Sequence, residues 1–245
     1  MQAVILAAGR ARRLGRLATQ VPKCMLRVGG KPLVEHVAGA LALDATLTHV
    51  ILVAGPTDEL AENCVRAALP REVPMTLVTD PAQHGEMGSL RQARPHLGAE
   101  FLVSDANILY YASLVSSLTA HHRRLLPCAT VAVTASPYAA RTHLSVRAVD
   151  GCARLPTLTE ADREKSWVYT GVGVFRRSVL DAGTDEENLC AVMARLIAED
   201  EVAVVRYSGF YGHVATPFCL GRTRQRWSEH MSTLAVSSAG ATHCT

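Results

Sequence analysis

Cationic side chains follow the first apolar segment of the chain. The segment Val4-Ile5-Leu6 runs into the small residues Ala7-Ala8-Gly9, and the cationic residues close behind it are Arg10, Arg12, Arg13, Arg16 and Lys23. Small residues allow a backbone to approach a ligand closely. Backbone N–H groups at a strand-to-helix turn favour anions, as do Arg and Lys side chains. This pattern predicts a cradle for a polyphosphate.

Strands and helices alternate along the first half of the chain. Apolar runs predict strands over 3–8, 49–54, 75–78 and 101–105. Apolar spacing and capping residues predict helices over 33–43, 57–69, 89–97 and 114–122. Such alternation is typical of a parallel, doubly wound α/β sheet, whose ligands bind beyond the carboxyl ends of the strands. The turn 9–15, the loop 80–88 and Asp105 come together at that edge.

Shorter strands are predicted for the second half. They are 130–134, 144–149, 169–175 and 202–207, and Asp150-Gly151 is a hairpin signal after the second of them. The other predicted segments are a helix over 187–198, a turn-rich loop over 209–217, and a basic helix after Gly221 with a Ser/Thr/Ala-rich tail. The predicted fold is a doubly wound, mainly parallel, Rossmann-like three-layer α/β sandwich with a small β-rich extension.

The overall composition excludes several classes of protein. The 245 residues are 49% hydrophobic and 19% charged, which is typical of a globular chain with a sizeable core. The net charge of +3 gives no indication of nucleic acid or a membrane surface as a partner. The seven Cys are scattered and form no CxxC pair, as is typical of reduced intracellular thiols. No apolar run reaches membrane length, so we expect a soluble, cytoplasmic protein.

The opening motif resembles the nucleotidyltransferase family that makes nucleoside-diphosphate sugars and related activated phosphates. The family signature is L-A-A-G-x-G-x-R-L, then P-K, then G-K-P-L. Its counterparts here are Leu6-Ala7-Ala8-Gly9, Arg13-Leu14, Pro22-Lys23 and Gly30-Lys31-Pro32-Leu33, with Ala11 in place of the second glycine. A dinucleotide-binding turn is the alternative, but it would show G-x-G-x-x-G and an acidic residue after the second strand.

The resemblance implies a nucleotidyl transfer reaction. An acceptor phosphate oxygen attacks the α-phosphorus of a nucleoside triphosphate, and pyrophosphate leaves. Arg13 would hold the pyrophosphate, and Lys23 would stabilise charge at the α-phosphate. The residues implied to contact the nucleotide are Leu6, Ala7, Ala8, Gly9 and Ser89. Ser89-Leu90 followed by Ala93 resembles the family's S-L-x-x-A helix start, although a plain helix N-cap is the alternative.

The resemblance also implies a catalytic Mg²⁺. The family carries a metal-binding Asp at the position of Asp105, usually after Gly, where Ser104 stands here; an Asp that caps the next segment is the alternative. The loop 209–217 resembles the late motif W-x-D-V-x-T-P, and His213 stands where a second metal-binding Asp is often found. Imidazole prefers softer metals than Mg²⁺. The second ligand therefore comes from elsewhere, or the metal site is weak, or activity is lost.

A glycine-containing strand resembles the segment of the family that contacts the acceptor. It is Tyr169-Thr170-Gly171-Val172-Gly173, so Tyr169 and Gly171 are implied to bind the acceptor. Trp167 and Tyr169 have aromatic faces that suit a cationic or cyclic acceptor. Ordinary packing in the core is the alternative for both rings.

Taken together, the sequence predicts a single nucleotidyltransferase domain over residues 1–245. It is divided into an NTP-binding half (1–125), an acceptor-binding half (126–221) and a C-terminal helix and tail (222–245). The chain most resembles small phosphocholine and phosphonate cytidylyltransferases, which favours CTP over UTP and a small phosphorylated or phosphonylated acceptor. A homodimer is one assembly to consider. The alternatives are a sugar-1-phosphate nucleotidyltransferase and a non-catalytic nucleotide-binding relative.

Overall fold

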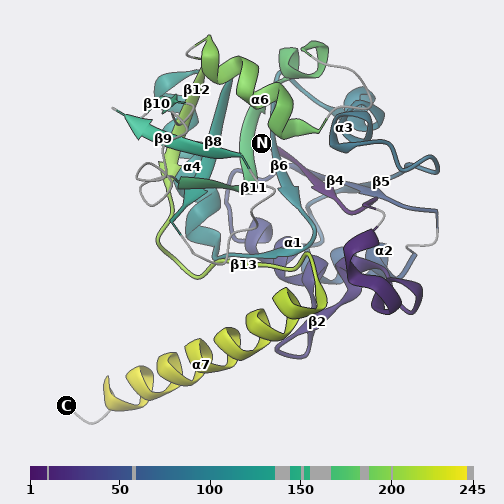
Figure 1. The fold of residues 1–245 in the computed structure, drawn as a ribbon, viewed down its shortest axis with the longest axis vertical. Coiled ribbons are helices and arrows are strands. Elements are labelled where there is room, and N and C mark those ends of the chain that lie inside the picture. The colour runs from purple at the N-terminus through teal and green to yellow at the C-terminus, as the bar shows by residue number, and fades with distance from the viewer. Residues whose placement is uncertain are drawn as a thin grey trace.

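The computed structural model describes residues 1–9, 11–56, 59–135, 144–149, 152–154, 167–182, 188–199 and 201–241. Within these residues, one mixed sheet has nine strands in the order β5-β4-β1-β6-β11-β8-β12-β10-β9 (Figure 1). The strands are β1 (Gln2–Leu6), β4 (His49–Ala54), β5 (Met75–Thr79), β6 (Glu100–Asp105), β8 (Ala129–Thr134), β9 (Ser145–Val149), β10 (Cys152–Arg154), β11 (Trp167–Arg176) and β12 (Val202–Arg206).

The sheet is mainly parallel, as predicted. β4 and β6 run parallel to β1 on its two sides, and β5 runs parallel to β4. β11 is antiparallel to both β6 and β8, and β12 is parallel to β8. β9 and β10 form an antiparallel pair that also contacts β11 and β12, which is the predicted β-rich extension. The predicted turn Asp150-Gly151 lies outside the described residues.

Helices cover both faces of the sheet, which confirms the three-layer sandwich. On one face lie α1 (Leu33–Ala42), α2 (Glu59–Ala68) and α4 (Ala112–Leu125), and on the other lie α3 (Glu86–Ala93) and α6 (Leu189–Ala198) (Figure 1). Successive residues of a strand point to opposite faces. Ala3 and Ile5 of β1 accordingly belong to the first core, which lies between the sheet and α1, α2 and α4. Val4 belongs to the second core, which lies between the sheet and α3 and α6.

A third apolar cluster lies beneath the ligand edge of the sheet. Its residues come from η1 (Arg12–Thr19), β2 (Arg27–Val28), the start of α1, β7 (Ile108–Leu109), the first part of α7 (Pro217–Ala241) and the loops between them. The short elements η2 (Lys23–Met25), β3 (Lys31–Pro32) and β13 (Gly212–His213) adjoin these residues in sequence. Two further 3-10 helices, η3 (Arg94–His96) and η4 (Arg177–Asp181), follow α3 and β11. The remainder of α7 extends away from the body of the molecule (Figure 1).

Two boundaries in the first half differ from the predicted ones. β1 ends at Leu6 and not at Ala8, and the Ala7 amide, which donates to the Val53 carbonyl at 2.7 Å, joins the end of β1 to β4. α3 begins at Glu86, so Ser89 lies inside the helix and is not its cap. The Ser89 amide donates to the Gly85 carbonyl at 3.0 Å, as expected within the first turn.

The C-terminal helix also differs from its prediction. α7 begins at Pro217 within the predicted loop 209–217, which also contains β13. The Cys219 amide donates to Thr216 Oγ1 at 3.1 Å, so Thr216 caps a helix whose first residue is proline, a favoured arrangement. The helix continues to Ala241 through most of the predicted tail. No helix among the described residues is both long and apolar enough to span a membrane.

Both predicted halves of the chain contribute strands to the one sheet. β6 of the NTP-binding half pairs along five register positions with β11 of the acceptor-binding half. The division at residues 125 and 221 stays a prediction.

Trp227 is expected to anchor α7 to the body. Its ring makes edge contacts with His36 and Phe210, each at a centroid distance of 5.1 Å. Trp227→Ala should lower the free energy of unfolding by about 2–4 kcal/mol, the usual cost of removing a large packed side chain. Urea denaturation measures this loss. Met231→Ala on the same helix is the control, since Met231 is 45% exposed, and an equal loss in both variants would contradict the assignment.

Candidate active site

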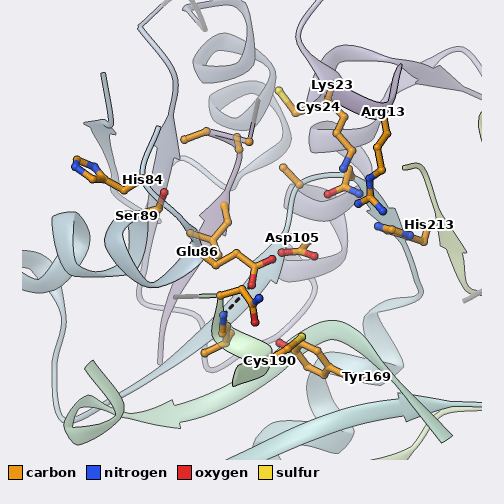
Figure 2. A pocket seen from close by; sticks show the side chains of 18 residues that line it. Arg13, Lys23, Cys24, His84, Glu86, Ser89, Asp105, Tyr169, Cys190 and His213 are labelled. Carbon is orange, nitrogen blue, oxygen red and sulfur yellow. Dashed lines mark hydrogen bonds between the residues drawn. The ribbon is translucent and has the colours of Figure 1, made fainter. Parts of the chain in front are cut away.

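A cavity of about 260 Å³ lies at the carboxyl ends of β1 and β6 (Figure 2). Of the residues predicted from sequence, those that line it are Leu6, Ala7, Ala8, Gly9, Arg13, Lys23, Ser89, Asp105, Tyr169 and His213. The structure therefore brings together predicted phosphate, nucleotide and metal ligands from both halves of the chain. Gly171 and Trp167 are not among the lining residues.

The register between β1 and β6 places the small-residue turn beside Asp105. Leu6 is the register partner of Asp105, and the Ala106 amide donates to the Leu6 carbonyl at 3.0 Å. Both strands therefore end at the same level. The turn Ala7-Ala8-Gly9 leaves this level directly, so its backbone and the Asp105 carboxylate face the same space.

The turn after β1 directs some of its cationic side chains into the cavity. Leu14 is buried in the third cluster and its amide donates to the Ala11 carbonyl at 2.9 Å, which fixes the turn. Arg13 beside it projects into the cavity, and Lys23 from the start of η2 projects from the same side (Figure 2). Arg12 and Arg16 are exposed and outside the lining, and Arg10 lies outside the described residues.

The charges in the cavity are strongly perturbed by burial. Burial raises the pKa of Asp105 to about 8, the nearby Glu86 carboxylate adds to the rise, and Lys23 opposes it. Burial also lowers the pKa of Lys23; Asp105 opposes this shift, and Arg13 adds to it. The charged form of each group is therefore less stable in the cavity than in water. Charged phosphate oxygens and cations supplied by a ligand would stabilise the charged forms.

Gly171 lies directly against the Asp105 carboxylate. Its φ is +85°, and a Cβ added there would lie 2.6 Å from Asp105 Oδ2. The register of β11 against β8 shifts between Tyr169 and Gly173, so the strand bulges at this point. Only glycine combines this backbone angle with so close an approach. Gly171 thus packs its backbone against a residue of the site, and its contact with the acceptor stays a prediction.

The two predicted aromatic residues of β11 have different surroundings. Tyr169 is buried and lines the cavity, and burial raises the pKa of its hydroxyl well above the usual value. Trp167 is half-buried, packs against the second core, and has the guanidinium carbon of Arg206 5.4 Å from its ring centroid. The acceptor role of Trp167 stays a prediction.

Residues that the sequence analysis did not identify complete the wall. Glu86, the first residue of α3, accepts a hydrogen bond at Oε2 from the Leu189 amide at 2.9 Å. This bond joins α3 to the start of α6, where Asn188 caps the helix by accepting from the Ala191 amide at 2.8 Å. Cys190 also lines the cavity, and burial raises the pKa of its thiol to about 11. In the sequence, the Gly85-Glu86 pair could have indicated Glu86, because an acidic residue in the first turn is typical of a helix start.

The cavity offers oxygen ligands suited to a hard cation. The carboxylates of Glu86 and Asp105 point toward one another, whereas His213 lies on the Arg13 side of Asp105 (Figure 2). Among the described residues, no group of three His, Cys, Asp or Glu side chains is arranged to hold a metal ion. Mg²⁺ commonly uses one or two protein carboxylates and completes its shell with water and substrate phosphates. The donor set fits such an ion.

Comparison with known proteins identifies the class of this site. Residues 3–172, more than half of the chain, match the family described as the MobA-like NTP transferase domain. The fold is thus that of an NTP transferase domain, as the opening motif predicted. The chain belongs to the MobA-like NTP transferase domain family.

The curated relatives of the chain have names that differ in the molecules they mention. The chain is 21% identical over 229 residues to the bifunctional protein GlmU of Methanococcus aeolicus, covering 90% of this chain and 53% of that one. It is 31% identical over 114 residues to UTP--glucose-1-phosphate uridylyltransferase AglF of Haloferax volcanii, covering 46% of each chain. It is 26% identical over 121 residues to the CMP-5'-(3-aminopropyl)phosphonate synthase of Streptomyces rubellomurinus, covering 49% of this chain and 19% of that one. These matches span about half or less of each relative.

Solved structures share the fold over nearly the whole chain. The inositol-1-phosphate CTP transferase from T. maritima superposes with a TM-score of 0.74 at 18% identity, covering 89% of this chain and 90% of that one. An apo UDP-glucose pyrophosphorylase superposes with a TM-score of 0.77 at 13% identity, covering 94% and 98%. At these identities the likeness establishes the fold alone.

Gly171→Ala should damage both stability and turnover. An added methyl group would force φ out of the left-handed region and push Asp105 aside, so we expect a stability loss of about 1–3 kcal/mol. Gly39→Ala is the matched control, because Gly39 lies in α1 with open space around its Cβ position, and it should be neutral or stabilising by up to about 1 kcal/mol. Urea titration and an initial-rate assay measure the two effects. Unchanged stability and turnover in both variants would contradict the close approach of Gly171 to Asp105.

Asp105→Asn should stabilise the ligand-free protein increasingly as pH rises. The folded pKa of about 8 lies above the ordinary 3.8, so the unfolded chain loses its proton first and folding becomes less favourable between these values. Asparagine has no such titration. Melting temperatures with a chelator present at pH 5, 7 and 9 should show an advantage for the variant that grows with pH and reaches about 4 °C or more. A difference in melting temperature that does not change with pH would contradict the raised pKa of Asp105.

Proposed function

We propose that the protein transfers a nucleotidyl group from a nucleoside triphosphate, CTP in preference to UTP, to a small phosphorylated or phosphonylated acceptor. Pyrophosphate is the second product. The observation that carries this proposal is the meeting of Arg13, Lys23 and Asp105 around one cavity beside the small-residue turn. Membership of the NTP transferase family and the likeness to proteins named for CTP or CMP support it.

The protein's contribution to this reaction is positioning and neutralisation of charge. An acceptor oxygen attacks the α-phosphorus while the bond from that phosphorus to the bridging oxygen of pyrophosphate breaks. Lys23, held half-buried at the start of η2, faces the α-phosphate, where negative charge accumulates. The more exposed Arg13 holds the departing pyrophosphate. The turn Ala7-Ala8-Gly9 leaves room for the nucleotide to approach the backbone.

We propose Mg²⁺ as the cofactor, with Asp105 as its protein ligand. The ion would neutralise charge on the phosphate oxygens when it is bound. Of the two candidates for a second ligand, His213 occupies the position expected from the family motif, and Glu86 points toward Asp105 (Figure 2). Glu86 offers the harder oxygen donor.

The acceptor is proposed to enter along the wall formed by Tyr169 and the start of α6. Tyr169, Asn188 and Cys190 line this part of the cavity. The Tyr169 ring is a rigid surface for a compact acceptor, and the acceptor phosphate or phosphonate would lie near Lys23. The assembly state of the protein, including a homodimer, stays a prediction.

A sugar-1-phosphate acceptor is the second candidate within the same reaction class. The likeness to a protein named as a glucose-1-phosphate uridylyltransferase favours it. The presence of His213 in place of a second Asp is the observation that favours a non-catalytic nucleotide-binding relative. A panel of CTP, UTP, GTP, ATP and dTTP, each with phosphocholine-like, phosphonate and sugar-1-phosphate acceptors, separates these candidates by pyrophosphate release. Nucleotide binding without release from any pair would overturn the proposed reaction.

Lys23→Ala should lower kcat by about 10²–10³-fold, the range found when one donor to a developing anion is removed. Lys31→Ala is the matched control, because Lys31 is exposed and pairs with Glu35 on the surface at 3.2 Å. Pyrophosphate release under saturating substrates measures both variants. Normal turnover by Lys23→Ala would contradict the proposed role of Lys23 in the reaction.

A further inference from the structure

A tyrosine hydroxyl from the late loop of the chain holds the bulge of β11. Tyr211 is 1% exposed and directly precedes β13, and its hydroxyl donates to the Thr170 carbonyl at 2.9 Å. Thr170 is itself fully buried, and its side-chain hydroxyl donates to the Ala132 carbonyl of β8 at 3.0 Å. Both the side chain and the carbonyl of this residue are therefore engaged, immediately before the close approach of Gly171 to Asp105.

The bond from Tyr211 sets the orientation of the peptide group between Thr170 and Gly171. The Thr170 carbonyl and the Gly171 nitrogen belong to one planar unit, so a partner for the carbonyl also restricts φ of Gly171. Glycine adopts positive and negative φ about equally readily, so its identity alone does not select the observed +85°. Rotation of this peptide would break the bond and leave buried polar groups unpaired, which is costly. The hydroxyl therefore favours the conformation in which Gly171 lies against Asp105.

Other contacts hold the backbone of Tyr211 independently of its hydroxyl. Arg226 Nη1 of α7 donates to the Tyr211 carbonyl at 3.0 Å. β13, which begins at the next residue, pairs with β7. The hydroxyl is thus presented to β11 from a fixed backbone, and its removal alone leaves these backbone contacts in place.

We propose that Tyr211 is a positioning residue for the metal site: through the peptide between Thr170 and Gly171, it holds the Asp105 carboxylate in place for Mg²⁺. This inference rests on the proposed function, which assigns the ion to Asp105. A Cβ at position 171 would lie 2.6 Å from Asp105 Oδ2, so the glycine backbone is one wall of the space that the carboxylate occupies. A carboxylate with a displaced wall is held less firmly and binds its ion more weakly. Outer partners of metal ligands typically change metal affinity by about 10–100-fold.

A purely structural role for the hydroxyl predicts a different outcome. If the bond only joins the loop to β11, its loss lowers the stability of the fold, and the folded protein keeps its affinity for the metal. The informative quantity is therefore the ratio of two dissociation constants, that of metal-free CTP and that of the Mg²⁺–CTP complex. Contacts to the base and the ribose are common to both and cancel in this ratio.

Titration calorimetry without acceptor measures the two constants, with EDTA in the metal-free titration and Mg²⁺ in excess over CTP in the other. The unchanged protein should bind the Mg²⁺–CTP complex at least about tenfold more tightly than metal-free CTP. Tyr211→Phe, which removes only the hydroxyl, should lower this ratio by about five- to tenfold, with the constant for metal-free CTP changed by less than about twofold.

Tyr207→Phe is the matched control. Tyr207 is 7% exposed; its hydroxyl donates to the Phe210 carbonyl at 3.1 Å, just before Tyr211, and accepts from the Tyr111 amide at 3.0 Å. This variant also removes a hydroxyl bonded to a buried carbonyl and loosens the same loop, but it leaves the bond to Thr170 intact. Both variants should have a lower urea midpoint than the unchanged protein, whereas only Tyr211→Phe should change the ratio.

An unchanged ratio in Tyr211→Phe would overturn the inference. An equal fall in both variants would also overturn it and assign the effect to the loop as a whole, and so would CTP binding by the unchanged protein that does not depend on Mg²⁺. Pyrophosphate release is measured on the same preparations. Absence of release, with a ratio that falls only in Tyr211→Phe, would refute the proposed reaction and leave the positioning role standing, so the two failures are distinguishable.

Discussion

The parallel pairing of β1 with β6 is the constraint on which the site depends. It sets Leu6 opposite Asp105, so the turn after one strand and the carboxylate at the end of the other share one level. On the far side of β6, the antiparallel β11 brings Gly171 against the same carboxylate. Asp105 is therefore enclosed by backbone on two sides. Glycine at 171 follows from this crowding, because a side chain there would collide with the Asp105 carboxylate.

Two aspartates, Asp80 just after β5 and Asp105 at the end of β6, have pKa values shifted in opposite directions. Asp105 is buried near a second carboxylate, and its pKa rises to about 8. Asp80 is buried as well, but donors from Ser89 and His84 hold its pKa below the usual value. Burial is the largest influence on both groups, so the hydrogen-bond partners decide the sign. The Asp80 carboxylate therefore favours its charged form, whereas the charged form of Asp105 is disfavoured unless a cation or ligand compensates it. Such divergence is typical of sites in which similar groups have separate roles.

Local patterns were sufficient to predict most of the central sheet, and contacts between distant segments decided the rest. β4 was predicted to its exact bounds, because a short apolar run rich in β-branched residues that ends at Gly55-Pro56 has the length and flanking residues of a buried strand. The motif around Arg13 and Lys23 predicted one wall of the cavity. Glu86 was missed because its importance comes from Asp105 and Leu189, which are remote in sequence. The start of α7 was missed although Thr216-Pro217 is a capping signal, because these residues were interpreted as part of a family loop motif.

The arrangement of Glu86 bears on the departure at His213. An imidazole in place of a carboxylate removes one negative charge from the Arg13 side of Asp105. The pairing of β13 with β7 holds His213 in place, since His213 is the register partner of Ile108 and is buried. Glu86 supplies a carboxylate on the opposite side of Asp105, and its bond to the Leu189 amide ties that charge to the start of α6. The cavity therefore keeps two carboxylates, but the second is contributed by α3 and not by the late loop. This shift places the negative charge on the side of Tyr169 and Cys190 and leaves the Arg13 side more positive, in agreement with the proposed binding of pyrophosphate by Arg13.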